Sequence, residues 1–280
     1  MELNLDTGRL WVFIGGFGLF WLLETAWPAR LWRGEYRGLA ARLRRLGFHG
    51  LLATVNTVLV RIVVYVPLLL WLVYVEEEGY GLARWLGLVG WPELLVSIVV
   101  LDAFDYVWHR MNHRVPLLWR LHKAHHADTG MDVTTALRFH PGELLVSAGM
   151  KALWVVAWGP SVVAWFLFEA LISLCAQFHH SNLDLPDRVE RVLGAVIVTP
   201  RFHAAHHRVE RRYGNANFST ILSCWDRVAG TFSPPPTARG ETDPSTYGLP
   251  EGRPLAFTLS AWFDEPFRKR NLGIDRPPAR

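Results

Sequence analysis

The chain has few cysteines and few charged residues for its length. Its 280 residues include two cysteines, Cys175 and Cys224, which lie far apart and form no CxxC motif, so neither a disulfide framework nor a thiolate zinc site is indicated. Charged residues make up 19% of the chain, whereas hydrophobic residues make up 51% and include 14 tryptophans. This balance contains too much apolar material for an ordinary soluble enzyme and favours a membrane protein of one domain.

Two metal-binding motifs are also missing. The chain contains no Glu-x-x-His, which excludes the carboxylate-rich di-iron site of ferritin-like bundles. It contains no HExxH, which argues against a zinc-dependent membrane hydrolase. The net charge of +4 fits the basic cytoplasmic loops of a membrane protein, so we expect no nucleic-acid partner.

What the chain has instead is histidine at helical spacing. Eleven of its 12 histidines lie between residues 109 and 207, and the spacing HxxHH occurs twice. Residues three and four apart project from one face of a helix, and imidazole is the commonest nitrogen ligand of transition metals. The clustered residues are His109 and His113; His122, His125 and His126; His179 and His180; and His203, His206 and His207.

The number of imidazoles limits the kind of metal site. Nine or ten exceed the four ligands of a tetrahedral zinc site and suit a pair of irons with open positions for O2. A mononuclear site of two histidines and one carboxylate remains open by counting, but it would leave most of the histidines unused.

The motifs in this region resemble those of the fatty acid hydroxylase and sterol desaturase family of membrane-embedded di-iron oxygenases. They follow the family's order between Asp102 and Phe232, about half of the chain. The resemblance implies a four-helix membrane core, a cytosolic cap and two irons held by histidines, with O2 and two electrons as co-reactants. The segments concerned are HRMNH (109–113), HKAHH (122–126), RFHP (138–141), HHSN (179–182), TPRFHAAHH (199–207), RYGNANFS (212–219) and WDRVAGTF (225–232).

The resemblance also implies the ligand set. His179 competes with His180 for one position, and the ligation of His140 is left open. Asp105 stands one turn before His109, so we expect it to accept that ring's N–H, or else to pair with a nearby cation such as Arg110. The residue Asn182 is expected to hold a metal-bound water or a neighbouring ligand. The implied iron ligands are His109, His113, His122, His125, His126, His180, His203, His206 and His207.

Apolar segments predict an all-α integral membrane bundle of about four to five spanning or hairpin helices. A cleaved signal peptide is disfavoured for the first segment, because the chain begins MELNLDTGR. The arginine-rich segment 28–50 is predicted to be a cytoplasmic loop, and alternation of the spans then places all histidine clusters on the cytoplasmic side. The apolar segments cover residues 10–27, 51–75, 93–108, 144–158 and 161–177.

We therefore predict a single membrane-embedded domain over residues 1–280. Residues 10–177 would contain the transmembrane helices and the first two histidine boxes, and residues 178–232 a cytosolic, histidine-rich cap with the last boxes. Residues 233–280, rich in proline, glycine, serine and threonine at their start, are predicted to form an irregular tail.

The predicted reaction is hydroxylation of an unactivated C–H bond of a lipid, of the sterol or fatty acyl type, that enters from the bilayer. Desaturation of the same lipid class is the alternative, because both reactions begin with removal of one hydrogen. No stretch resembles a fused redox domain, so an external electron donor of the ferredoxin, cytochrome b5 or reductase type is expected. A histidine-rich metal transporter is a remote alternative, which would place its polar groups near the bilayer midplane.

Overall fold

The computed structural model describes residues 5–31, 37–236, 243, 246–249 and 258–267. These residues form helices and loops without a β-strand, and their β-pairing is limited to three isolated bridges. The prediction of an all-α fold is confirmed for this part of the chain.

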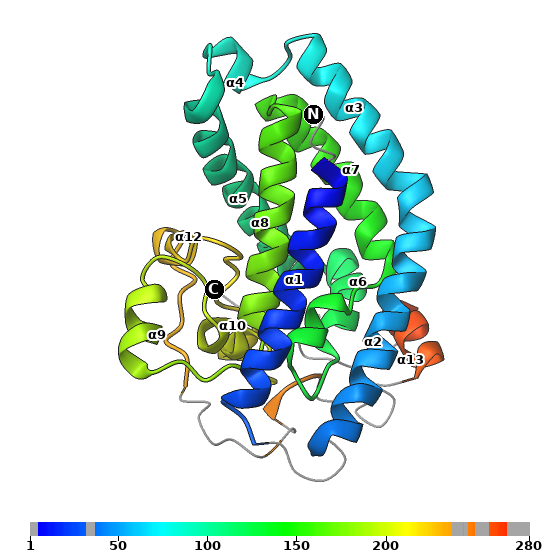
Figure 1. Ribbon diagram of the computed structural model, residues 1–280, viewed down its shortest axis with the longest axis vertical. Coiled ribbons are helices and arrows are strands. Elements are labelled where there is room, and N and C mark those ends of the chain that lie inside the picture. Colours follow the sequence, from blue (N-terminus) through cyan, green and yellow to red (C-terminus); the bar gives the residue numbers. More distant parts are fainter. Residues whose placement is uncertain (1–4, 32–36, 237–242, 244–245, 250–257, 268–280) are drawn as a thin grey trace.

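Long helices run side by side through the molecule (Figure 1). Helix α8 packs against both α1 and α5, and α3 packs against α7. A core shared by α3, α5, α7 and α8 contains Leu72, Leu101, Val155 and Phe168. The long helices are α1 (Leu5–Ala26), α2 (Gly38–Val60), α3 (Val66–Glu77), α5 (Gly90–Arg114), α7 (Pro141–Trp158) and α8 (Val162–His180).

Short helices gather at the ends of this bundle. Helix α4 (Leu82–Trp85) lies at one end, and most of the others lie at the opposite end, where α1 and α8 finish (Figure 1). We call this second end the cap end. Its elements are α6 (Pro116–His126), η3 (Val133–Leu137), α9 (Asp187–Leu193), α10 (Pro200–His206), α11 (Arg211–Gly214), α12 (Cys224–Val228), α13 (Leu259–Asp264) and η6 (Glu265–Phe267). The clustered histidines lie there, on the C-terminal turns of α5 and α8 and on the short helices α6 and α10.

Two described helices are long and apolar enough to cross a membrane, Thr7–Ala26 and Val162–His180. The helices on either side of Arg61–Tyr65 make a third candidate if they count as one bent span. Many large apolar side chains on these helices are exposed, which suits contact with lipid. Examples are Leu10, Trp11, Leu19, Leu22, Leu59, Val63, Leu70 and Leu167.

The region after α1 differs from the sequence prediction. The segment 28–50 was expected to be a loop, yet α2 begins at Gly38. Two of its arginines contact protein rather than solvent alone: Arg45 is 4% exposed and is paired with two carboxylates, and Arg42 is paired with Glu24. The predicted span 51–75 is interrupted by the π-helical turn Arg61–Tyr65. Pro67 follows directly, and proline lacks the N–H that a continuous helix requires.

The predicted irregular tail contains a helix in its described part. Helix α13 and the turn η6 lie against α6, and Trp262 packs on Leu52 and Ala124. The remaining parts of the tail, residues 237–242, 244–245, 250–257 and 268–280, lie outside the described residues.

Candidate metal centre

Imidazole nitrogens from four helices form two groups at the cap end. Within each group, one ring nitrogen from every residue lies within 4.8 Å of the others. Seven of the nine side chains are at most 4% exposed. The first group contains His109, His113, His122, His126 and His206, and the second group contains His125, His180, His203 and His207.

The two HxxHH motifs contribute to both groups. On α6, His122 and His126 belong to the first group and His125 to the second. On α10 the division is reversed, with His203 and His207 in the second group and His206 in the first. In both helices the i and i+4 histidines share a group because they lie about 40° apart around the axis, whereas the i+3 histidine projects to the other side.

Nitrogens within the groups face one another directly. In the second group, the Nε2 atom of His180 lies 3.1 Å from that of His125 and 3.1 Å from that of His203. In the first group, the Nε2 atoms of His122 and His126 are 3.2 Å apart. Metal–nitrogen bonds of about 2.0–2.1 Å separate neighbouring ligand atoms by roughly 3.0–3.4 Å, so these spacings fit ligands of one ion.

The outer nitrogens of the rings fix their tautomers. The Nδ1 atom of His206 lies 2.7 Å from the Ala216 carbonyl oxygen, and that of His109 lies 2.8 Å from the oxygen of Phe218. A carbonyl only accepts, so each Nδ1 carries the proton and each Nε2 keeps a lone pair. The Nε2 atom of His206 is buried without a hydrogen-bond partner among the described residues. These features fit a bound transition-metal ion.

A carboxylate that the sequence analysis did not identify orients one ring of the first group. Glu143, in the first turn of α7, accepts a hydrogen bond from Nδ1 of His122 at 2.7 Å. Histidine ligands often donate to a carboxylate in this way, which orients the ring. The sequence signal for Glu143 was a single acidic residue in the first turn of an apolar helix, directly after RFHP. This signal did not identify its partner, which lies 21 residues earlier in the chain.

Burial keeps four of the cap-end imidazoles, those of His125, His126, His206 and His207, neutral. It lowers the pKa of His206 to about 3, although the bond to the Ala216 carbonyl opposes the shift. Burial, followed by neighbouring histidines, also lowers the pKa values of His125, His126 and His207 well below their usual range. At neutral pH these rings therefore offer lone pairs to a metal without competition from protons.

The loop after α11 supplies carbonyls that orient two of the rings. Asp226 accepts hydrogen bonds from the backbone N–H groups of Phe218 and Ser219, both at 2.8 Å. Asn217 adopts a φ of 60°, a left-handed conformation that asparagine tolerates better than most residues. The closing NANFS and WD motifs thus hold the loop that carries the Ala216 and Phe218 carbonyls.

A buried charge network fixes the chain after α6. Arg45 donates to both carboxylate oxygens of Asp128 at 2.8 and 2.9 Å and to Asp132 at 2.7 Å. Burial alone would raise the pKa of Asp128, but the Arg45 guanidinium holds it well below its usual range. Arg138 of the RFHP motif donates to the Ala124 carbonyl at 2.8 Å, and its own carbonyl lies 3.1 Å from Nδ1 of His125.

Two predicted histidines lie outside both groups. His179 is buried, and its ring centroid lies 4.1 Å from that of His203, but it belongs to neither group. Adjacent helical residues point about 100° apart, so only His180 faces the second group. His140 precedes α7; its Nδ1 accepts from the N–H of Gly142, and its Nε2 lies 3.2 Å from the Phe263 carbonyl oxygen.

Asp105 and Asn182 also lie elsewhere than expected. The carboxylate of Asp105 accepts a hydrogen bond from Thr220 at 2.7 Å, whereas His109 uses the Phe218 carbonyl. The side chain of Asn182 is occupied by the backbone of Arg30, through bonds of 2.9 and 3.0 Å. Asn182 thus joins the segment after α1 to the end of α8.

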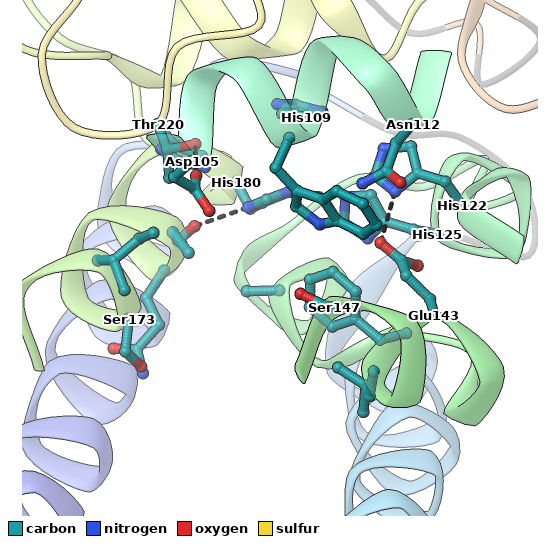
Figure 2. A pocket seen from close by; sticks show the side chains of 18 of the residues that line it. Asp105, His109, Asn112, His122, His125, Glu143, Ser147, Ser173, His180 and Thr220 are labelled. Carbon is teal, nitrogen blue, oxygen red and sulfur yellow. Dashed lines mark hydrogen bonds and ion pairs between the residues drawn. The ribbon is translucent and has the colours of Figure 1, made fainter. Parts of the chain in front are cut away.

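A cavity of about 280 Å³ extends from the histidines between the long helices (Figure 2). Histidines of both groups form one end, including His109, His122, His125 and His180. Its walls come from α1, α5, α7 and α8 and combine apolar with polar side chains.

Comparison with known proteins identifies a family for the region that carries the histidines. A sequence profile for the family described as fatty acid hydroxylase matches residues 94–231, from α5 to the loop after α12. This match, which covers about half of the chain, places the protein in the fatty acid hydroxylase family. The matched region contains every residue of both histidine groups and Glu143 as well.

Three relatives illustrate the range of the family. Ornithine lipid hydroxylase OlsE of Rhizobium tropici is 28% identical, over 52% of this chain and 44% of its own length. Human alkylglycerol monooxygenase is 30% identical, over 52% and 31%. Mouse cholesterol 25-hydroxylase is 26% identical, over 51% and 47%. The chain thus spans less than half the length of each of these three relatives, and no solved structure matches it.

Proposed function

We propose that the chain is a membrane-embedded lipid hydroxylase that holds two iron ions, one in each histidine group. The overall reaction would convert R–H, O2, two electrons and two protons into R–OH and water. The observation that carries this proposal is the pair of adjacent nitrogen-only groups at the end of one cavity. The stacked rings of His126 and His207, one from each group, have centroids 4.3 Å apart.

The composition of the two groups favours iron. Nine imidazoles are unsuited to magnesium or calcium, which prefer oxygen ligands, and exceed the needs of a single zinc ion. Bound iron would supply the activation of O2. The chain's own residues would orient the ligands through their Nδ1 bonds, exclude water by burial and place the substrate in the cavity.

Hydroxylation is favoured over desaturation by the names of the relatives, which are hydroxylases and a monooxygenase acting on different lipids. The lipid would reach the cavity from the bilayer, and an external one-electron donor of the ferredoxin, cytochrome b5 or reductase type would supply the electrons. We place the protein in the membrane as a multi-pass chain with the cap end on the cytoplasmic side. The basic N-terminal part of α2 lies at that end (Figure 1), as expected for cytoplasmic segments.

Lipid mass spectrometry tests the reaction. Host cells would express the wild type, a His125→Ala, His126→Ala double variant, or the control Arg188→Met, which removes an exposed charge from α9. We expect one lipid class to gain one oxygen in the wild type and the control but not in the double variant. A class that loses two hydrogens instead would identify a desaturase. Identical lipids in all three strains, with iron bound and a donor supplied, would contradict the proposal.

A further inference from the structure

Lys151 and Glu169 form an ion pair inside the helical bundle, away from the histidines. The Nζ atom of Lys151 lies 2.6 Å from Oε1 of Glu169, and the two side chains are 23% and 17% exposed. Glu169 lies in the middle of the candidate span α8. A charged side chain at mid-membrane depth is energetically costly, so such residues usually face a cavity and serve a function.

Lys151 ends a polar stripe on α7 that lines the cavity. Glu143, Ser147 and Lys151 stand four residues apart, and all three contact the cavity. At a rise of 1.5 Å per residue, Lys151 lies about 12 Å along the helix from Glu143, the partner of His122. The stripe therefore connects the histidine end of the cavity with the ion pair.

Helix α8 presents polar side chains to the same space. Ser173, one turn after Glu169, and Gln177 line the cavity. Figure 2 shows Ser173 on one side of the cavity and Ser147 and Glu143 on the other. A tunnel for hydrocarbon alone requires no polar side chains, since buried polar groups without partners are destabilising. The walls instead suit an amphiphile whose polar group enters between the helices.

The ammonium group of Lys151 has donors left for a ligand. It carries three N–H groups, and within the described residues Glu169 is its one hydrogen-bond acceptor. The ring of Trp165 lies 5.9 Å from Nζ and covers it on one side. Hydrogen bonds between charged partners are roughly twice as strong as neutral ones, so an anionic oxygen group is the ligand that best matches this cation.

Building on the proposed function, we infer that Lys151 binds a carboxylate or phosphate group of the lipid substrate, and that Glu169 orients its ammonium group. The reactive carbon then lies at a fixed distance from that group, because α7 separates Lys151 from Glu143, the partner of His122, by about 12 Å along its axis. The anion is either the carboxylate of a free fatty acid or the phosphate of a lipid headgroup.

A binding assay on the purified full-length protein tests this site without requiring turnover. Radiolabelled palmitate would be displaced by unlabelled palmitate, lysophosphatidic acid, or the neutral methyl palmitate. We expect methyl palmitate to compete at least about tenfold more weakly than the better anion. Stronger competition by palmitate would identify a fatty acid site, and stronger competition by lysophosphatidic acid a headgroup site. Equal competition by the methyl ester, or no binding of either anion, would overturn the inference.

Variants separate recognition from stability. Lys151→Met should reduce the affinity for the anion about tenfold, to the level of the methyl ester, whereas Lys151→Arg should retain the preference. The control Arg188→Met should behave as wild type. Equal weakening of acid and ester in Lys151→Met, with a lowered melting temperature, would show that the ion pair only joins α7 to α8.

The position of oxidation gives an independent readout. If Lys151 fixes the anionic end, myristate and stearate should be oxidised at the same carbon counted from the carboxylate, and Lys151→Met should scatter the position. Oxidation of myristate and stearate at the same carbon counted from the methyl end would overturn the inference. Anion preference in a protein that oxidises no lipid would refute the proposed function and leave the binding site intact.

Discussion

The two histidine groups differ in how their rings are held. In the first group, His122 donates to the Glu143 carboxylate, and His109 and His206 donate to carbonyls of the 216–218 loop. In the second group, the Nδ1 atoms of His203 and His207 are buried without a partner among the described residues. Three rings of the first group are thus oriented by hydrogen bonds from outside their own helices. In the second group, the orientation of His203 and His207 depends on the packing of α10.

This difference predicts unequal responses of the two sites to mutation. Outer contacts raise the basicity of a ligand and fix its direction, so their loss should weaken the first group selectively. Removal of a ligand itself should disable either group, because both contribute to one cavity end.

Removal of a single ligand, from either group, should have the largest effect. His206→Ala and His207→Ala should each lower lipid oxidation by about a hundredfold or more, beyond the loss seen for outer contacts. Each variant should also lose iron, measured by elemental analysis of the purified protein. His140→Gln, which removes a histidine outside both groups, is the matched control. Iron retained in full by both alanine variants would contradict the ligand assignment.

Glu143→Gln should have the next largest effect and should act on the first group alone. An amide oxygen holds the ring of His122 less strongly than a carboxylate, so we expect iron affinity at that group to fall about tenfold to a hundredfold. Chelator titration should then resolve one weakened and one normal iron. Equal weakening of both irons would show that the two groups do not respond separately.

Acid should destabilise the iron-free protein through both groups. Because burial lowers the pKa of His206 from 6.5 to about 3, the unfolded chain binds more protons than the folded chain between these pH values. Stability is therefore complete above about pH 6.5 and falls as the pH decreases, by about 1.4 kcal/mol per pH unit for each such histidine. Denaturant unfolding at several pH values measures this slope. A flat profile between pH 7 and about pH 5 would argue against buried, neutral rings.

Asp105→Asn should have the smallest effect. The carboxylate bonds Thr220 rather than His109, and an asparagine oxygen can still accept that bond. We expect iron content to remain as in the wild type and activity to change less than about tenfold, below the effect of losing a contact to a metal ligand. Loss of iron comparable to that of Glu143→Gln would restore Asp105 as a partner of the first group.

Helical periodicity explains why the sequence could identify these histidines. The HxxHH spacing places imidazoles on adjoining faces of α6 and α10, and the structure distributes the histidines of both motifs over its two groups. Their division into two groups depends on how α5, α6, α8 and α10 cross, which local spacing does not contain. The same holds for Glu143, whose partner lies on another helix.

Tertiary contacts also explain the errors in the fold. The arginines of segment 28–50 were expected in a cytoplasmic loop, but Arg42 and Arg45 lie within α2, where buried carboxylates pair with them. Likewise, Trp262 forms part of a helix because it can pack against Leu52 and Ala124, which lie far away in sequence. A composition rich in proline and glycine near the start of the tail gave no sign of this contact.

The iron content of the purified wild-type protein tests the central claim most directly. Two separate histidine groups predict two irons per chain by elemental analysis, with zinc and copper absent after reconstitution under reducing conditions. One iron per chain, or a preference for zinc at both groups, would contradict the account of a two-iron lipid hydroxylase.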